Sequence, residues 1–373
     1  MDVHGKTSVN ENGNFNFHSN VNGEGAYDRR ILLTGGSGFI GSHVVDKLVY
    51  HQDKWYYVVN YDKLDYCASL KNNHKVESSQ NYKFVKGDIL NKQKLLDVMR
   101  DENIDTVMHF AAQSHVDNSF LNAKPFHLTN VEGTQTLLSA AREHGIRFFL
   151  HVSTDEVYGG DSIVALSETA DLKPTNPYSK SKAQGEIIAK LFWEKYSFPV
   201  VITRGNNVYG PRQYPEKVIP KFISLLQRGK KCCIHGDGSP ARNFMYVEDA
   251  ARAYLTVLEQ GEVGEIYNIG TDFQITIREL AATLTRKVHG DVPADELNTY
   301  VEFVHDRPYN DMEYHVECSK LRCLGWKPAV PWEDGLRTTI EWYRHNFSNW
   351  PRAAKALAPF PTIKEEKEID PEL

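Results

Sequence analysis

The chain has 373 residues, of which 41% are hydrophobic and 25% charged, and its formal net charge is −6. These values are ordinary for a globular protein with a sizeable core. The negative charge gives no electrostatic basis for binding nucleic acid or an anionic membrane, so any bound phosphate must be held by local Arg, Lys and backbone N–H groups.

The five cysteines are odd in number and show no Cys-x-x-Cys spacing, so neither a disulfide framework nor a zinc site is indicated. His109, His115 and His151 share no spacing with carboxylates, and we expect them to be structural, with no metal site. The chain has neither a long apolar run nor a signal peptide in residues 1–28. We therefore predict a soluble cytoplasmic protein.

Strands and helices alternate between the first 28 residues and Tyr209, which predicts a parallel sheet covered by helices on both faces. This is the doubly wound α/β class. We expect strands over Arg30–Thr34, Tyr56–Tyr61, Tyr82–Lys86, Thr106–Phe110, Phe148–Val152 and Val200–Thr203, and helices over Phe39–Tyr50, Lys92–Arg100, Pro125–Glu143 and Pro177–Tyr196.

After Tyr209-Gly210-Pro211 the pattern changes to turns and short elements, which predicts a second lobe. The first 28 residues are rich in Asn, Gly and Ser and cannot bury enough surface to fold. We expect a disordered tail over residues 1–28, a Rossmann domain over 29–207, a smaller substrate lobe over 208–355 from which residues 265–269 return to the sheet, and a solvated tail over 356–373.

A glycine-rich turn, Gly35-Gly36-Ser37-Gly38-Phe39-Ile40-Gly41, follows the first strand and opens a helix, which is the context of a dinucleotide-binding fingerprint. Asp62 ends the second strand, where a carboxylate accepts hydrogen bonds from a ribose and repels a 2′-phosphate. This pairing favours NAD over NADP, although the neighbouring Lys63 opposes it. Asp88 contacts adenine or caps a helix, and Ala111-Ala112 pack on the cofactor or on a helix.

Two further motifs carry chemistry. Tyr178 and Lys182 are four residues apart on one helix face, so the ammonium can favour the phenolate, a base suited to an alcohol. Asp155 and Glu156 follow a buried strand at the sheet's carboxyl edge, where they form an acid–base pair or, alternatively, a solvated strand-end cap. The two motifs together predict an enzyme that removes water through a transient ketone.

These residues resemble the extended short-chain dehydrogenase/reductase superfamily and, within it, the nucleotide-sugar 4,6-dehydratases, with those acting on dTDP-glucose most similar. The similarity extends from about Arg30 to about Trp350 and includes Asp62-Lys63-Leu64, His109–Asp117, Ser153–Gly159, Pro215–Pro220, Arg242–Asp249, Tyr267–Gly270 and Asp306-Arg307-Pro308. The Thr154-Asp155-Glu156 triplet is its specific part.

The resemblance implies an NAD-dependent hydro-lyase that converts dTDP-glucose to dTDP-4-keto-6-deoxyglucose and water, by C4 oxidation, elimination across C5 and C6, and hydride return to C6. Tyr178 with Lys182 is then the base at C4, and Thr154 hydrogen-bonds the C4 oxygen. Glu156 removes the C5 proton and Asp155 protonates the leaving hydroxyl. The resemblance also implies a homodimer that pairs helices Pro125–Glu143 and Pro177–Tyr196.

The same resemblance implies which residues hold each ligand. For NAD they are Gly35, Gly38, Phe39, Ile40, Gly41, Asp62, Lys63, Leu64, Asp88, Ile89, Ala111, Ala112, Ser114, Thr129, Tyr178 and Lys182. For the nucleotide-diphosphate glucose they are Ser114, Thr154, Asn207, Lys217, Val218, Arg242, Asn268, Arg307 and Asn310. Two departures affect the base and sugar contacts: Asn310 stands where bacterial members have His, and Arg204-Gly205 precede Asn206-Asn207.

Three alternatives stay open: the same reaction on UDP-glucose, a UDP-sugar 4-epimerase or decarboxylase relative, and a catalytically silent NAD-binding sensor. An epimerase needs no acid near C6, and Asp155 would repel the C6 carboxylate that a decarboxylase binds. The presence of Tyr178, Lys182, Asp155 and Glu156 together argues against a silent sensor.

Overall fold

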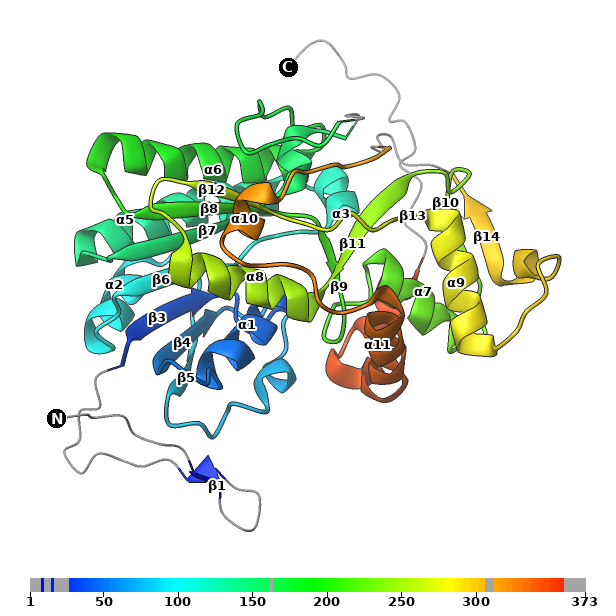
Figure 1. The fold of residues 1–373 in the computed structure, drawn as a ribbon, viewed down its shortest axis with the longest axis horizontal. Helices are drawn as coiled ribbons and strands as arrows, with labels where there is room; N and C mark the ends of the chain where they lie inside the picture. Colours follow the sequence, from blue (N-terminus) through cyan, green and yellow to red (C-terminus); the bar gives the residue numbers. More distant parts are fainter. Residues whose placement is uncertain (1–7, 10–14, 17–26, 161–163, 306–311, 359–373) are drawn as a thin grey trace, which may run out of the picture.

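The computed structural model describes residues 8–9, 15–16, 27–160, 164–305 and 312–358. Its centre is a seven-stranded sheet in which every neighbouring pair of strands is parallel, in the order β12-β8-β7-β6-β3-β4-β5 (Figure 1). The strands are β3 Arg29–Thr34, β4 Tyr56–Asp62, β5 Tyr82–Lys86, β6 Thr106–His109, β7 Phe148–Thr154, β8 Val200–Gly205 and β12 Ile266–Ile269. The strand order reverses between β3 and β6, which is where open α/β sheets bind ligands.

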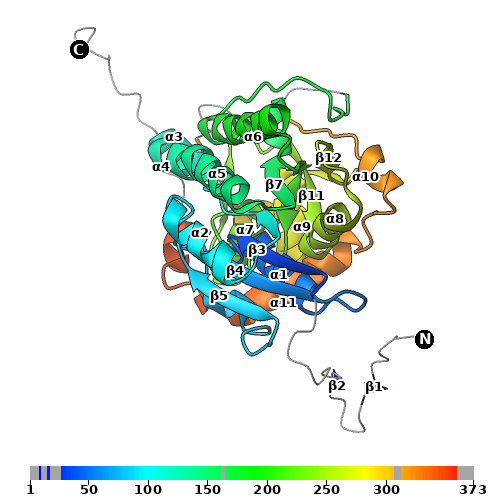
Figure 2. The same cartoon turned by 90° about the vertical axis from the view of Figure 1, so that its left-hand side faces the viewer.

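Helices cover both faces of this sheet (Figure 2). Helices α1 (Phe39–Val49) and α8 (Val247–Gln260) contact each other, as do α2 (Lys92–Asp101) and α5 (Thr134–His144), and α5 and α6 (Pro177–Tyr196). Successive residues of β3 enter two different cores, because side chains alternate across a strand. A sheet buried on both faces explains why its strands are almost continuously apolar. The predicted doubly wound class is confirmed.

The second half of the chain is more regular than the sequence patterns predicted. It contains α7 (Val218–Leu226), α9 (Ile277–His289) and α11 (Trp332–Asn346), the last of 15 residues. Strands β13 (Gln274–Thr276), β11 (Ala241–Tyr246) and β9 (Asn207–Tyr209) form one sheet, and β10 (Cys232–His235) pairs with β14 (Val301–Val304). These helices were missed although α9 begins with a capping box between Thr276 and Glu279, a signal that the sequence carries.

The helix predicted over Pro125–Glu143 consists of α4 (Lys124–Phe126), a π-helix η2 (His127–Gly133) and α5. Gly133 ends the π-helix, and a Cβ there would lie 2.5 Å from Ile89 Cδ1. The remaining short elements are β1 Ser8–Val9, β2 Phe15–Asn16, η1 Leu70–Asn73, α3 Val116–Leu121, η3 Asp155–Tyr158, η4 Leu297–Tyr300, α10 Ser319–Cys323, η5 Phe347–Asn349 and η6 Ala353–Leu357.

The far end of the chain returns to the loop that follows β4. Trp350 Nε1 donates to the Cys67 carbonyl at 3.0 Å, and Asn349 Nδ2 donates to Asn72 Oδ1 at 2.9 Å. Ser69 Oγ donates in turn to the Asn349 carbonyl at 3.0 Å. We call these five residues the terminal clasp.

The predicted domain boundaries remain a proposal. β12 joins the central sheet beside β8, and α8 packs on α1, so the range 208–355 also supplies elements to the Rossmann half. The two predicted tails lie mostly outside the described residues. Among the helices of the described ranges, none has the length and apolar composition needed to cross a membrane.

Candidate active site

A cavity of about 260 Å³ lies at the carboxyl ends of the central strands. Of the residues predicted to hold NAD, those that line it are Gly35, Gly38, Phe39, Ile40, Gly41, Asp62, Lys63, Asp88, Ile89, Ala111, Ala112, Ser114, Thr129, Tyr178 and Lys182. Leu64 is absent from this lining, and its backbone N–H donates to Asp62 Oδ1 at 2.7 Å. Leu64 therefore fixes Asp62 and does not line the cavity itself.

The glycine-rich turn has the geometry that a dinucleotide requires. Gly35 adopts a φ of +76°, and a Cβ at this position would lie 2.7 Å from the Ala111 nitrogen, so only glycine fits. Gly38 is the N-cap of α1 and provides no side-chain cap. The first-turn N–H groups and the positive end of the helix therefore suit a pyrophosphate.

The carboxylate of Asp62 is held in place by two backbone donors, since Ser37 N donates to Oδ2 at 3.0 Å and Leu64 N to Oδ1. The Lys63 ammonium lies 3.4 Å from Asp65 Oδ2 and 3.9 Å from Asp88 Oδ2. Its charge is thus balanced by carboxylates, which weakens its attraction for a 2′-phosphate. Asp88 is not the cap of the following helix, because Asn91 caps α2.

Asp155 and Glu156 begin the turn η3 directly after β7. Asp155 is 2% exposed; Asn206 Nδ2 donates to its Oδ2 at 2.6 Å and Thr154 Oγ1 donates to its Oδ1 at 3.1 Å. Burial, together with the Glu156 charge, raises the pKa of Asp155 to about 7. This is the direction that a proton donor requires.

Glu156 is hydrogen-bonded to the residue that caps the start of α6. Asn176 Nδ2 donates to Glu156 Oε2 at 3.2 Å, and Asn176 is also the N-cap of α6, where its Oδ1 accepts from Ser179 N at 2.8 Å. The sequence analysis missed both Asn206 and Asn176. The second carried a signal, because Asn before Pro at a helix start is a typical cap.

Tyr178 and Lys182 lie one turn apart on α6. Tyr178 forms a hydrogen bond with Thr154, and burial, together with the Glu156 charge, raises the pKa of Tyr178 above its ordinary value. Lys182 Nζ donates to the Val152 carbonyl at 2.6 Å, and burial lowers the pKa of Lys182 to about 8. The expected lowering of the Tyr178 pKa by Lys182 is thus outweighed, within the protein itself, by desolvation of the phenol.

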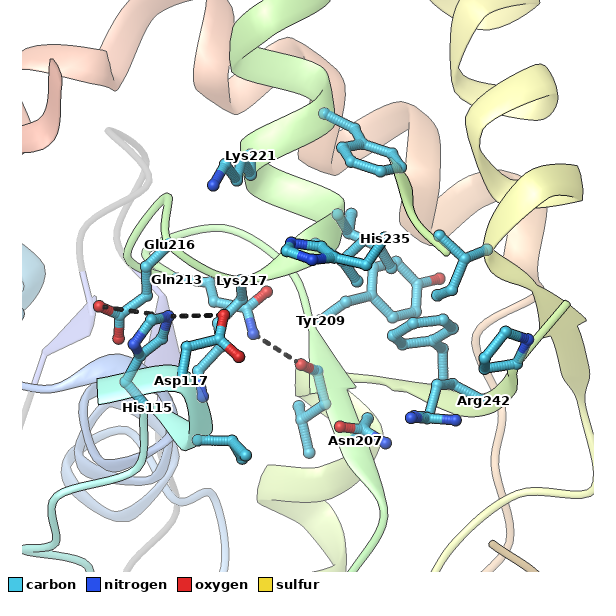
Figure 3. A pocket seen from close by; sticks show the side chains of 18 of the residues that line it. His115, Asp117, Asn207, Tyr209, Gln213, Glu216, Lys217, Lys221, His235 and Arg242 are labelled. Atoms are coloured by element: carbon cyan, nitrogen blue, oxygen red, sulfur yellow. Dashed lines mark hydrogen bonds and ion pairs between the residues drawn. The ribbon is translucent and has the colours of Figure 1, made fainter. Parts of the chain in front are cut away.

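A second cavity, of about 180 Å³, shares lining residues with the first. Figure 3 shows side chains that line this second cavity. Asn207, Lys217, Val218 and Arg242, all predicted to hold the substrate, line it together with Glu156. Val208, Gln213, Glu216 and Lys217 line both cavities. The predicted substrate contacts Ser114 and Thr154 line the first cavity, beside Tyr178. A ligand that spans the two cavities therefore reaches Glu156 in the second and Tyr178 in the first, whereas Asp155, which is 2% exposed, lines neither cavity.

Glu216 is a buried carboxyl at the junction of the cavities that the sequence analysis did not single out. The Tyr66 hydroxyl donates to its two oxygens at 3.0 and 3.2 Å, and burial raises the pKa of Glu216 to about 7. The only sequence feature that pointed to Glu216 as a site residue was its position next to Lys217 in the Pro215–Pro220 segment.

Asn268 does not lie with the other predicted substrate residues. It is fully buried and lines neither cavity; its Nδ2 donates to the carbonyls of Leu166 and Glu317, both at 3.0 Å, and its Oδ1 accepts from Tyr158. Both amide donors are used inside the fold, so its role is structural. Arg307 and Asn310 fall outside the described residues.

Comparison with known proteins agrees with this geometry. The family model of GDP-mannose 4,6 dehydratase matches residues 32–339. The chain belongs to this family. A mouse dTDP-D-glucose 4,6-dehydratase is 53% identical over 337 residues, which cover 90% of this chain and 95% of the relative.

Two other members of the family show its range. A trifunctional Arabidopsis thaliana protein that includes a UDP-glucose 4,6-dehydratase is 46% identical over 90% of this chain and 50% of its own length. The crystal structure of a dTDP-glucose 4,6-dehydratase from Streptomyces venezuelae, with NAD and TYD bound, has a TM-score of 0.81 and 39% identity, and covers 87% of this chain and 99% of that chain. The predicted membership of the nucleotide-sugar 4,6-dehydratases is confirmed.

Proposed function

We propose that this chain is an NAD-dependent hydro-lyase that converts dTDP-glucose to dTDP-4-keto-6-deoxyglucose and water. The observation that carries the proposal is that the Asp155 and Glu156 carboxyls lie near enough to Tyr178 to act on its pKa, with Glu156 lining the second cavity and Tyr178 the first. The mouse relative and the NAD-bound Streptomyces venezuelae structure, both dTDP-glucose 4,6-dehydratases, support it.

Each residue has a role that follows from its position in the site. When bound, NAD would accept the hydride from C4, return it to C6 in its reduced form, and place a positive charge near the phenol. Tyr178 takes the proton of the C4 hydroxyl, and Thr154, its hydrogen-bond partner, holds the C4 oxygen. Glu156 removes the C5 proton that the ketone acidifies, while Asp155 gives its proton to the C6 hydroxyl, which leaves as water.

Arg242 and Lys217 support the diphosphate part of the substrate. Both line the second cavity, and a guanidinium matches phosphate oxygens with two parallel hydrogen bonds. The nucleotide part of the substrate is dTDP by similarity to the mouse relative; the competing choice is UDP, because the Arabidopsis relative includes a UDP-glucose 4,6-dehydratase.

The homodimer and the cytoplasmic location remain predictions. Leu121 on α3 and Ile187 and Leu191 on α6 support a dimer, because these large apolar side chains are 53%, 48% and 52% exposed. Helices α3 and α6 contact each other and α6 contacts α5, so a two-fold contact over these helices would cover all three side chains.

We expect the purified protein to carry NAD and to prefer NAD to NADP, because Asp62 repels a 2′-phosphate and the Lys63 charge is balanced by Asp65 and Asp88. Denaturing the protein, extracting the cofactor and typing it with enzymes specific for each dinucleotide measures this. Recovery of mainly NADP would show that Asp62 does not select the cofactor.

The proposed reaction makes a prediction about hydride that no net dehydrogenase shares. With dTDP-glucose deuterated at C4, we expect the label in the C6 methyl group of the product, no crossover with unlabelled molecules, and uptake of solvent hydrogen only at C5, where Glu156 exchanges its proton. Mass spectrometry of the product reads all three outcomes. UDP-glucose assayed in parallel decides the nucleotide, and stoichiometric release of NADH would contradict the dehydratase reaction.

A further inference from the structure

Arg204, one of the two departures noted in the sequence, does not reach the substrate. It lies on β8, has no exposed surface and lines neither cavity. Its Nε donates to Glu186 Oε2 at 3.0 Å and its Nη2 donates to Glu186 Oε1. Its Nη1 donates to the Tyr158 hydroxyl at 2.6 Å and to the Glu168 carbonyl at 3.1 Å. Only the rigid fork of a guanidinium can make this set of bonds.

The two side-chain partners of Arg204 lie on the two elements that carry the proposed chemistry. Glu186 is on α6, one turn beyond Lys182 and on the same helix face. Tyr158 ends the turn η3 that begins with Asp155 and Glu156. One buried cation therefore joins the tyrosine–lysine element to the carboxylate element.

Sheet register and hydrogen bonding extend this link. In the parallel ladder Arg204 stands between Ser153 of β7 and Asn268 of β12. Asn268 Oδ1 accepts from the Tyr158 hydroxyl at 2.8 Å, so the phenol is fixed from two strands at once. This contact also explains why Asn268 is buried and saturated without lining a cavity.

We infer that Arg204 is a positioning residue, which holds the Tyr178–Lys182 element in register with the Asp155–Glu156 turn. The inference rests on the proposed function. A buried ion pair gives little net stability, because the desolvation of both charges offsets their attraction. What the guanidinium supplies is fixed geometry, and a displacement of about 1 Å at a catalytic group can lower a rate by roughly 10²-fold.

The charge of Glu186 has a second effect, because it favours the protonated form of Lys182 and opposes the lowering of the Lys182 pKa by burial. The other titratable groups facing Lys182 are Tyr178, one turn earlier on α6, and His109 and His151, whose pKa values burial lowers, so both histidines are neutral. Removing the Glu186 charge should lower the Lys182 pKa further. The rate of C4 oxidation falls at high pH as Lys182 loses its proton, and in the variant this alkaline limb of the pH profile should move to lower pH.

The first test is Tyr158→Phe with Tyr56→Phe as its matched control. Tyr158→Phe keeps the ring, whose centroid lies 4.6 Å from the Arg204 guanidinium carbon, and removes only the hydroxyl. We expect kcat for dTDP-glucose to fall by about 10-fold or more with KM nearly unchanged, and enzyme-bound NADH to rise in the steady state, because the carboxylate turn is displaced. Tyr56→Phe removes an equally buried hydroxyl, which donates to Glu259 at 2.8 Å at the amino end of β4, and should leave the kinetics unchanged.

The second test is the apolar pair Arg204→Met/Glu186→Leu, which removes both buried charges; Lys190, the other partner of Glu186 at 3.3 Å, is 38% exposed and keeps its contact with water. We expect a folded protein with a thermal midpoint near that of the wild type, a lower kcat and the shifted alkaline limb. Wild-type kinetics in folded Tyr158→Phe and in the double variant would overturn the positioning role. A wild-type protein that converts neither dTDP-glucose nor UDP-glucose would instead overturn the proposed function and this inference with it.

Discussion

Tyr178→Phe should abolish most turnover while leaving the fold and the cofactor in place. The phenol lies in the first turn of α6, is hydrogen-bonded to Thr154 and lines the larger cavity, as a base for the C4 hydroxyl requires. Loss of a general base lowers rates by about 10²- to 10⁴-fold. The measurement is kcat with dTDP-glucose, together with the NAD content of the purified variant and its thermal midpoint.

The control for this variant is Tyr57→Phe, which removes a tyrosine hydroxyl that donates to Glu102 at 2.9 Å, far from the cavity at the amino end of β4. We expect its turnover to match the wild type. Near-normal turnover of Tyr178→Phe would rule out the phenol as the base and would leave Lys182, whose pKa lies at about 8, as the group to test next.

Asp155→Asn should separate oxidation from water loss. The amide has the same shape and can still accept a hydrogen bond from Asn206, but it cannot protonate the C6 hydroxyl. We therefore expect C4 oxidation to proceed, elimination to slow by about 10²-fold or more, and bound NADH to accumulate. Stopped-flow absorbance of the reduced cofactor measures the stalled state. Absence of any oxidation in this variant would show that Asp155 acts before the elimination.

The pH dependence of elimination gives an independent check. An acid with a pKa of about 7 donates its proton below that value, so the wild-type elimination rate should fall as pH rises through about 7. The Asp155→Asn variant should lose this dependence. Glu156→Gln should also stall after oxidation, but it keeps Asp155, so any residual elimination should still decline through the same pH range.

Local patterns were sufficient for most of the central fold. Apolar runs fixed the strands to within two residues at each end, because a strand buried on both faces is apolar throughout. The π-helix η2 was missed because it has no period of its own in a sequence. The helices α9 and α11 were missed for another reason: their amphipathic pattern is present, but the turns around them dominated the interpretation of this region.

Contacts within the candidate site could be predicted when both partners lie in one element, and could not be predicted when they lie on different strands. The glycine-rich turn and the Tyr178–Lys182 pair are each contained in one element, and the sequence alone placed their members together. The bond from Asn206 to Asp155 joins residues that are 51 positions apart, and it depends on the register that sets Gly205 beside Thr154 in neighbouring strands. That register is a property of the folded sheet, so no local motif could give it.

The terminal clasp links the wall of the nucleotide pocket to residues that lie about 280 positions later in the chain. Cys67 and Ala68 line the larger cavity, and the loop that carries them is held by Asn349 and Trp350. During synthesis the amino-terminal strands leave the ribosome first. The glycine-rich turn can therefore form early, but the loop that carries Cys67 and Ala68 gains these hydrogen bonds only after residues 349 and 350 have been made.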